Sequence, residues 1–438
     1  MFYGGYMNIR LYNARILTME KHRPIFEGEV WIKNEKIVYV GDKTEIEKMD
    51  KSLMPRINWD IEMDCNRDLL MPGFKDAHTH SGMTFLRSYA DDLPLKEWLN
   101  DKVFPYEAKL SPEDIYEFTR LAILEYVSGG VTSIFDMYLT PESIAEACMD
   151  TGMRCVLCGN VNNHTSNPEN MAREYEKLNK ISPLITYQLG FHAEYTCTKE
   201  LIYRISSLAH RYKAPVYCHL SETAVEVKDC KEKYGMTPTM FLDSMGMFEF
   251  GGGIFHGVHL TEQDMDVLRM RRVSVITNPA SNLKLASGIA PIAALDRKKI
   301  NVAIGTDGAA SNNALDMFRE IYLVSSLSKI YENDAASLDA ERVLRMATVH
   351  GAKAMKLNKC DTVAKGKFAD IILIDMHQPN MQPENNIQKN IVYSGNKVNV
   401  RMTMINGKIL YKDGEYNIGI TPEKVYEKCN EIARRILV

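Results

Sequence analysis

Long hydrophobic runs are missing from this 438-residue chain: no apolar stretch approaches the roughly 20 residues that a membrane-spanning helix needs. The first residues, MFYGGYMNIR, also lack the basic region and the apolar core of a secretory signal peptide. There is no block of like charges, and the formal net charge of −4 gives no general attraction to nucleic acid or to anionic membranes. We therefore expect a cytoplasmic protein without nucleic-acid or membrane partners, in which Met7 is an alternative start to Met1.

The chain also lacks clustered cysteines. Its nine cysteines are odd in number and scattered, which is typical of a reducing compartment and not of a disulfide framework. Cys155 and Cys158 form a C-x-x-C, but the surrounding sequence RCVLCGNV predicts a buried strand. Residues three apart in a strand point to opposite faces, so we interpret these two as core residues and not as a redox or metal pair.

Both ends of the chain contain short strand-like segments. Near the N-terminus these are IRLYNARILTM and EVWIKNEKIVYVG, and near the C-terminus they are ADIILID and VRMTMINGKILYKDGE, with a turn at Asn406-Gly407. We expect residues 1–68 and 360–438 to form one composite β-sandwich module. The final segment PEKVYEKCNEIARRILV predicts an amphipathic helix that packs against the body, with one apolar face made of Val425, Cys429, Ile432 and Ile436.

Residues 69–359 alternate strand-like and helical segments, which is typical of a parallel α/β architecture. We count eight strand candidates, each an apolar run that ends in a polar residue. They end near His78/His80, Asp136, Asn160, His192, His219, His256, Asn278 and Asp307. Eight such units predict a (β/α)₈ (TIM) barrel, whose chemistry gathers where the strands end. A doubly wound open sheet is the alternative, but no G-x-G-x-x-G follows the first strand.

His78-Thr79-His80 closes the first of these strands. Residues two apart in a strand point the same way, so His78 and His80 can offer two imidazoles to one metal ion. The alternative is that His78 and His80 are neighbours by chance and bind no metal. His219 and Asp307 end two other strands, and histidines plus one carboxylate with an open position are typical of a catalytic zinc site.

Glu222 stands three residues after His219, where a turn would place its carboxylate beside a metal site instead of on the metal. A bound divalent ion lowers the pKa of water towards about 7, and a neighbouring carboxylate can relay the proton to a substrate. A solvated loop glutamate is the alternative. His256, at the end of the sixth strand, would hold the attacking water. His259, in the same turn, is the alternative candidate for this role.

Several long strings of this sequence resemble the amidohydrolase superfamily, and more narrowly its methylthioadenosine/S-adenosylhomocysteine deaminase branch. The resemblance covers nearly the whole chain, including the C-terminal KGKFADIILID and INGKILYKDGEY. The strings in the barrel region are MPGFKDAHTHSGMTFLRSYADDLPLKEWL, HLSET, HGVHL, TNPASNLKLASGIAP and GTDGAASNN.

The resemblance implies one divalent metal ion per subunit, zinc or, as in some relatives, iron, bound by His78, His80, His219 and Asp307. It implies that Glu222 delivers a proton to the purine ring nitrogen beside the carbon under attack. It further implies that His256 and Asp307 orient and deprotonate the water. Members with two metals carry a lysine at the end of strand four, where this chain has LGFHAEY, so one metal is expected.

The same resemblance implies the substrate-binding residues. Trp98 matches the aromatic residue that packs on the nucleoside, and Glu107 matches the carboxylate that accepts hydrogen bonds from the ribose diol. His192 matches a histidine that contacts the base or the ribose, and Ser311 in GTDGAASNN belongs to the same set. His192-Ala193-Glu194 also matches the first half of the cytidine-deaminase signature, but the second half, P-C-x-x-C, is absent from the chain.

One departure from the branch concerns Gly159, in LCGNVNNHTSNP. Related deaminases place arginines after strand three to hold the amino-acid carboxylate of S-adenosylhomocysteine, and Gly159 stands at one of those positions. Without a bidentate cation, a charged tail binds more weakly than an apolar one. We therefore expect 5′-methylthioadenosine, 5′-deoxyadenosine or adenosine to be better substrates than S-adenosylhomocysteine.

The sequence thus predicts a metal-dependent hydrolytic deaminase of small adenosine-type nucleosides, which releases ammonia and the inosine analogue and could form a homo-oligomer. The alternative within the same chemistry is a hydrolase of another aromatic heterocycle, such as a guanine, pterin or triazine deaminase or chlorohydrolase. Glu107 discriminates between them, because a free base has no diol. A non-catalytic barrel with a scaffolding role is the alternative from another class, and the complete set of metal-ligand candidates argues against it.

Overall fold

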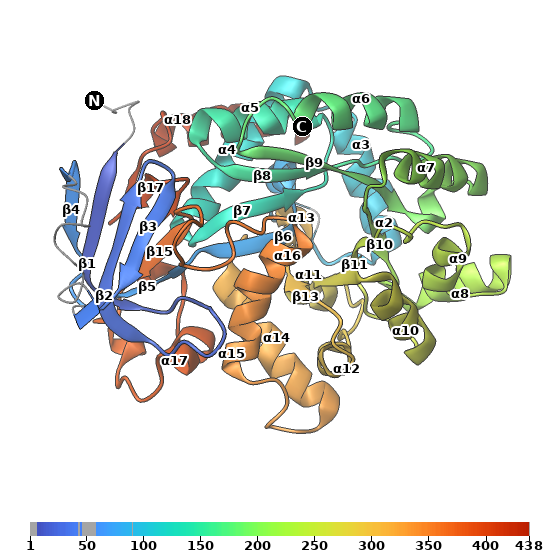
Figure 1. The fold of residues 1–438 in the computed structure, drawn as a ribbon. Coiled ribbons are helices and arrows are strands. Elements are labelled where there is room, and N and C mark those ends of the chain that lie inside the picture. Colours follow the sequence, from blue (N-terminus) through green and yellow to red (C-terminus); the bar gives the residue numbers. More distant parts are fainter. Residues whose placement is uncertain (1–6, 43, 46–57, 90, 438) are drawn as a thin grey trace.

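The structure, a computed structural model, describes residues 7–42, 44–45, 58–89 and 91–437 (Figure 1). Residues 1–6, and with them the choice between Met1 and Met7, lie outside the described residues. Two sheets organise the fold. One curls into a barrel in the middle of the chain, and the other combines strands from both ends of the chain, so that blue and red strands lie side by side in Figure 1.

The barrel sheet consists of parallel strands in sequential order. They are β6 (Phe74–His80), β7 (Val131–Asp136), β8 (Arg154–Cys158), β9 (Ile185–Ala193), β10 (Val216–Leu220), β11 (Gly252–His256), β12 (Val273–Thr277), β13 (Val302–Ile304) and β14 (Asp307–Gly308). The last two are halves of the eighth strand, and β14 closes the ring by pairing with β6, Asp307 opposite Thr79. The predicted (β/α)₈ barrel is confirmed, and the closed ring excludes the open sheet.

Helices cover the outside of the barrel, which explains why every residue of β7, β8, β10, β11 and β12 is buried (Figure 1). The longer ones are α4 (Pro112–Ser128), α5 (Pro141–Thr151), α6 (Pro168–Leu178), α7 (Lys199–Tyr212), α8 (Ala224–Tyr234), α9 (Pro238–Ser244), α10 (Glu262–Arg271), α14 (Met317–Glu332) and α17 (Ile387–Tyr393). The short ones are α2 (Leu95–Glu97), α3 (Phe104–Glu107), α11 (Pro279–Lys284), α12 (Ile292–Arg297), α13 (Ala309–Asn312), α15 (Ala340–Arg345) and α16 (Gly351–Ala354). Several start where the sequence offers a capping hydroxyl, such as Ser111, Thr198 and Thr261.

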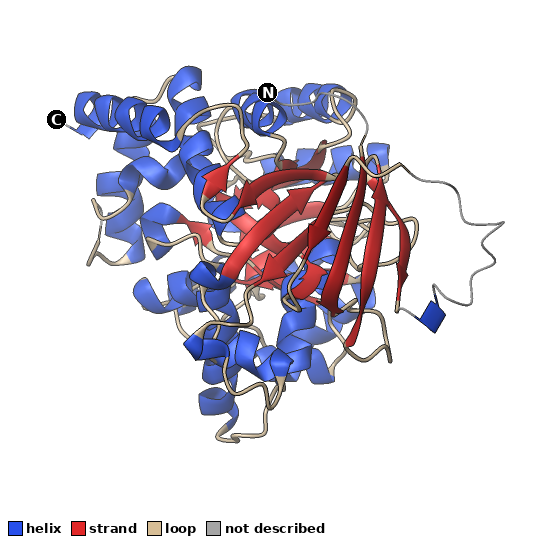
Figure 2. Ribbon diagram, turned by 90° about the vertical axis from the view of Figure 1, so that its left-hand side faces the viewer, coloured by secondary structure: helices blue, strands red, loops and turns tan. Residues whose placement is uncertain are grey.

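The second sheet is the module predicted from the two ends of the chain. Its strands are β1 (Asn8–Ile16), β2 (Phe26–Lys33), β3 (Lys36–Gly41), β4 (Ile61–Asp64), β5 (Leu69–Pro72), β15 (Ile371–Ile374), β16 (Val400–Ile405), β17 (Lys408–Lys412) and β18 (Glu415–Tyr416). β5 joins the two halves, because it pairs with β1 in parallel and with β15 in antiparallel orientation. Figure 2 shows strands side by side on one flank, with most helices on the other.

A single residue, Gly73, separates β5 of the terminal module from β6 of the barrel. The division into domains at residues 68 and 360 stays a prediction. The final helix α18 (Pro422–Leu437) buries the predicted face of Val425, Cys429, Ile432 and Ile436. All nine cysteines are unpaired and buried. Within the described ranges, no helix combines the length and the apolarity needed to cross a membrane.

A buried ion pair connects the barrel to the terminal module. Arg154, the first residue of β8, donates from Nε to Asp370 Oδ2 over 2.6 Å and from its terminal nitrogen to Oδ1 over 3.0 Å. Asp370 directly precedes β15 and also accepts a hydrogen bond from the backbone N–H of Asn406, at 2.7 Å. The two charged side chains are 3% and 0% exposed, so neither can exchange its partner for water.

Arg154→Met should lower the free energy of unfolding by about 3–5 kcal/mol, because it leaves the Asp370 carboxylate buried without its cation. Urea denaturation followed by circular dichroism measures the loss. Arg297→Met is the matched control, since Arg297 pairs with Glu332 at the surface and is 62% exposed; its cost should stay below about 1 kcal/mol. Equal losses of unfolding free energy in Arg154→Met and Arg297→Met would contradict the stabilising role of the buried Arg154–Asp370 pair.

Candidate active site

The carboxyl ends of the barrel strands bring five of the predicted residues together. His78 and His80 end β6, and their ring centroids are 4.7 Å apart, as expected for neighbours on one face of a strand. Asp307 at the start of β14 reaches both: its Oδ1 lies 3.5 Å from His78 Nε2 and 3.1 Å from His80 Nε2. His219 of β10 places its ring 4.9 Å from that of His78, and His256 of β11 follows at 5.5 Å from His219.

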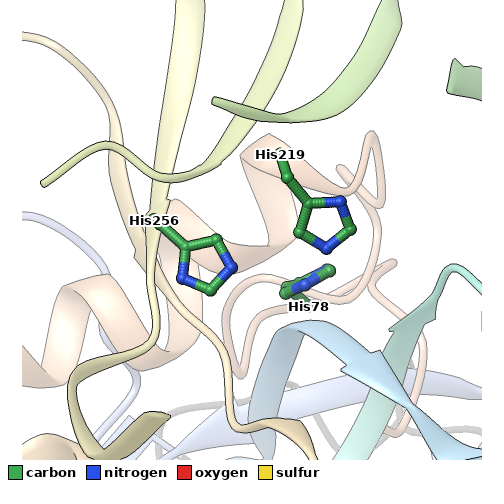
Figure 3. A group of neighbouring side chains, drawn as sticks. All are labelled: His78, His219 and His256. Carbon is green, nitrogen blue, oxygen red and sulfur yellow. The ribbon is translucent and has the colours of Figure 1, made fainter. Parts of the chain in front are cut away.

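Two sets of three side chains have ligand atoms that all lie within 4.8 Å of one another. His78, His80 and Asp307 form one set, and His78, His219 and His256 form the other. Figure 3 shows the three imidazoles of the second set turned towards a common centre. Imidazoles and a carboxylate at such distances are the donors that a divalent transition metal prefers.

His78 supports this interpretation. It is completely buried, yet neither of its ring nitrogens has a hydrogen-bond partner among the described atoms. Burial lowers the pKa of His78 to about 3, so its ring is neutral and keeps a lone pair. A buried polar atom without a partner is costly, and a metal ion that accepts the lone pair would remove the cost.

The imidazoles of His80 and His219 are oriented by backbone carbonyl groups. His80 Nδ1 is hydrogen-bonded to the carbonyl oxygen of Met137, and His219 Nδ1 to that of His192, at 2.8 Å. A carbonyl can only accept, so each Nδ1 carries a proton and each Nε2 is the nitrogen turned towards the centre. There Nε2 can give its lone pair to a metal ion, which displaces any proton on it.

Asp307 is ionised in this setting. Burial alone would raise the pKa of its carboxyl, but the contacts with His78 and His80 bring it well below its usual range. Its Oδ2 accepts hydrogen bonds from Ser281 at 2.5 Å and from Ser311 at 3.0 Å. Asp307 also adopts the left-handed φ of +62°, a conformation that costs energy and recurs at functional sites.

Glu222 lies beside this cluster, on the turn after β10. Its Oε2 is 3.7 Å from His256 Nε2, and its Oε1 accepts a hydrogen bond from Ser287 Oγ at 3.2 Å. Burial raises the pKa of Glu222, which favours the protonated form of its carboxyl group. The carboxylate of Glu226 accepts from the backbone N–H of Glu222 at 2.8 Å and thereby holds the turn.

The structure separates the two rival histidines. His256 lines the cleft above the cluster, and its Nδ1 donates to Asn282 Oδ1 at 2.7 Å, which leaves Nε2 facing Glu222. His259 instead hydrogen-bonds through Nε2 to the backbone carbonyl of Ser287, at 2.7 Å, and is not among the residues that line the cleft.

Trp98, Glu107 and His192 line the same cleft, as the sequence predicts, whereas Ser311 is buried against Asp307 and does not. The sequence interpretation did not include most of the remaining lining residues. They are Met83, Leu95, Leu99, Val103, Phe104, Tyr138, Leu139, Asn160, Asn162, Thr165, Tyr195 and Leu285. Of these, the sequence places Asn160 at a strand end without a role, and Tyr138 could have been found from its position just after β7.

Polar atoms of the wall lack partners within the protein. Trp98 Nε1, Glu107 Oε1, the Tyr138 hydroxyl and Asn160 Oδ1 are buried without a hydrogen bond to any described atom. Burial raises the pKa of Glu107 to about 7. Because buried polar groups are normally satisfied, these atoms indicate a wall built for a polar ligand.

Gly159 leaves no room for a side chain. A Cβ at this position would lie 2.6 Å from Met171 Sδ and 2.8 Å from the carbonyl oxygen of Gly190. The neighbouring Asn160, Asn162 and Thr165 line the cleft instead, and none of its described lining residues is a lysine or an arginine.

Comparisons with known proteins agree with this architecture. The profile of the Amidohydrolase family matches residues 69–410. Over 430 residues the chain is 39% identical to a 5-methylthioadenosine/S-adenosylhomocysteine deaminase from Desulforamulus reducens, covering 97% of this chain and 98% of that one. A protein of the same name from Caldanaerobacter subterraneus is 36% identical over 439 residues, covering 98% and 99%.

Among solved structures, an adenosine deaminase from Xanthomonas campestris with bound zinc superposes with a TM-score of 0.90 at 32% identity, covering 98% of both chains. A triazine hydrolase variant, at 20% identity and a TM-score of 0.87, shares the fold. The resemblance found in the sequence is thus confirmed. The chain belongs to the amidohydrolase family and, within it, to the 5-methylthioadenosine/S-adenosylhomocysteine deaminases.

Proposed function

We propose that the protein is a metal-dependent hydrolytic deaminase of adenosine-type nucleosides, which releases ammonia and the inosine analogue. One observation carries the proposal: Glu222 and the histidine–aspartate cluster form the floor of a cleft whose wall holds Trp98 and Glu107, and Oε1 of Glu107 has no hydrogen-bond partner among the described atoms. The names of the relatives and of the zinc-containing adenosine deaminase point to the same reaction.

One divalent ion per subunit, zinc or alternatively iron, would be held by His78, His80, His219 and Asp307. The unpartnered nitrogens of His78 and the Nε2 lone pairs of His80 and His219 fit this role. A divalent ion bound there supplies Lewis acidity, which lowers the pKa of water towards about 7.

The protein groups divide the proton transfers between them. Glu222, whose pKa is raised by burial, carries a proton and gives it to the purine ring nitrogen beside the carbon under attack. His256 Nε2 and Asp307 hold the attacking water, because Asn282 keeps the His256 proton on Nδ1. Water adds to the carbon, and the exocyclic nitrogen leaves as ammonia.

Residues of the cleft wall would bind the nucleoside and recognise its base and ribose. Trp98 packs on the substrate, Glu107 accepts hydrogen bonds from the ribose diol, and His192 contacts the base or the ribose. Burial lowers the pKa of His192 to about 4, so it acts as a neutral group. Ser311, in view of its hydrogen bond, would act through Asp307 and not on the substrate directly. A cytoplasmic location and assembly into a homo-oligomer stay predictions from the sequence.

Glu222→Gln should lower kcat for 5′-methylthioadenosine about 10²–10⁴-fold, because the amide cannot carry the proton. The measurement is ammonia release, screened over purine nucleosides, free bases and triazines.

Dialysis of the unsubstituted enzyme against a chelator should abolish the release of ammonia, and added Zn²⁺ should restore it. A Glu222→Gln enzyme with full activity, or a preparation that binds no divalent metal, would contradict the proposal.

Glu107→Ala should lower kcat/KM for 5′-methylthioadenosine by about 10–100-fold, because a charge-assisted hydrogen bond to the diol is lost. Ammonia release from adenine or guanine should barely change, since a free base has no diol. In the unsubstituted enzyme, KM for the nucleoside should rise as the pH falls below about 7, where Glu107 takes up a proton. This rise should be absent in Glu107→Ala. Equal losses on nucleosides and free bases would favour the alternative, a hydrolase of another heterocycle.

S-adenosylhomocysteine should have the lowest kcat/KM of four substrates, the others being 5′-methylthioadenosine, 5′-deoxyadenosine and adenosine. Its carboxylate finds no cation in the cleft, and Gly159 has no room for one. Steady-state kinetics on the four nucleosides measures this order. Asn160→Arg, which adds a cation to the wall, should shift the preference towards S-adenosylhomocysteine. The highest kcat/KM on S-adenosylhomocysteine in the unsubstituted enzyme would show that the inference is wrong.

A further inference from the structure

The segment after strand β12, residues 278–288, consists of helix α11 and the loop that follows it. It contacts the three side chains that are proposed to hold the water or carry the proton, although it supplies none of them. Its hydrogen bonds run from Ser281 Oγ to Asp307 Oδ2 at 2.5 Å, from His256 Nδ1 to Asn282 Oδ1 at 2.7 Å, and from Ser287 Oγ to Glu222 Oε1 at 3.2 Å. Only the last of these reaches the proton carrier.

The position of Ser287 is set from both sides. Its backbone N–H donates to the carbonyl oxygen of Asn282 at 2.8 Å, and its own carbonyl accepts from His259 Nε2 at 2.7 Å. Ala286 and Gly288 adopt φ of +55° and +129°, so the loop turns sharply on either side of Ser287. The side chain is 6% exposed, and its hydroxyl therefore has a fixed place.

This hydroxyl distinguishes the two oxygens of Glu222. Ser287 donates to Oε1, so Oε1 serves as an acceptor, and a proton on the carboxyl group resides on Oε2. Oε2 is the oxygen that faces His256 Nε2 at 3.7 Å. The backbone of Glu222 is already held by Glu226, and the bond from Ser287 restricts the remaining side-chain rotation.

We propose that Ser287 is a positioning residue that aims the protonated oxygen of Glu222 at the substrate, an inference that rests on the function proposed above. Ser287 acts through Glu222 and does not touch the reacting atoms. His259, by holding the Ser287 carbonyl, supports the same arrangement from the second side.

The test is a double-mutant cycle on ammonia release from 5′-methylthioadenosine, with Ser287→Ala, Glu222→Ala and the double variant. Ser287→Ala should lower kcat about tenfold and leave KM within about twofold, because the hydrogen bond acts on proton transfer and not on binding. In the Glu222→Ala background the same substitution should cost less than about twofold, since nothing is left to position.

Ser274→Ala is the matched control, because Ser274 is also 6% exposed and its hydroxyl accepts one hydrogen bond, from Asn301, at a site outside the cleft. Its kcat should equal that of the unsubstituted enzyme. Melting temperature and zinc content verify the folding of every variant.

An unchanged kcat in Ser287→Ala, or an equal loss with and without Glu222, would overturn the positioning role while the proposed function stands. An unsubstituted enzyme that releases no ammonia from any nucleoside would overturn the proposed function and this role with it.

Discussion

The closure of the barrel between its first and last strands is the constraint on which the site depends. Asp307 pairs through the backbone with Thr79, the residue between the two histidines of β6, although the two lie more than half the chain apart. That register puts the Asp307 carboxylate within 3.5 Å of both imidazoles. Because a shift by one residue would turn a strand's side chains to the other face, the cluster exists only if the ring closes in this register.

The two ends of the barrel strands serve different purposes. The carboxyl ends carry the unpartnered nitrogens of His78, the strained backbone at Asp307 and the buried carboxyl group of Glu222, all of which cost stability. At the opposite end, Arg154 and Asp370 form a buried, doubly hydrogen-bonded ion pair that joins the barrel to the terminal module. In barrels of this kind, residues at one end of the strands form the active site and residues at the other end stabilise the fold. The second group can therefore offset the stability that the first group costs.

Much of this could be predicted from the sequence, because chemistry at a barrel mouth follows a local pattern. His78, His80, His219, His256 and Asp307 each end an apolar run, and the fold then brings such ends together. The long segment after β6 could be interpreted only by resemblance, since Trp98 and Glu107 have no local signal of their own.

Other parts had no such signal. Ser287 lies in an irregular loop, and its contact with Glu222 depends on a tertiary turn that no periodicity encodes. The sequence likewise suggested that Ser311 touches the substrate, and only its position against Asp307 indicates an indirect role. The lack of room at Gly159 depends on how closely β9 approaches, which is a property of the packed sheet.

The place of β5 has a consequence for how the chain is made. Its neighbours in the sheet are β1, which precedes it in the chain, and β15, which is synthesised about 300 residues after it. Until then one edge of β5 exposes unpaired N–H and C=O groups, a template for wrong pairing with other chains. We therefore expect the nascent chain to be open to wrong pairing at β5 until β15 has been made, and we expect pairing across about 300 residues to slow the final assembly.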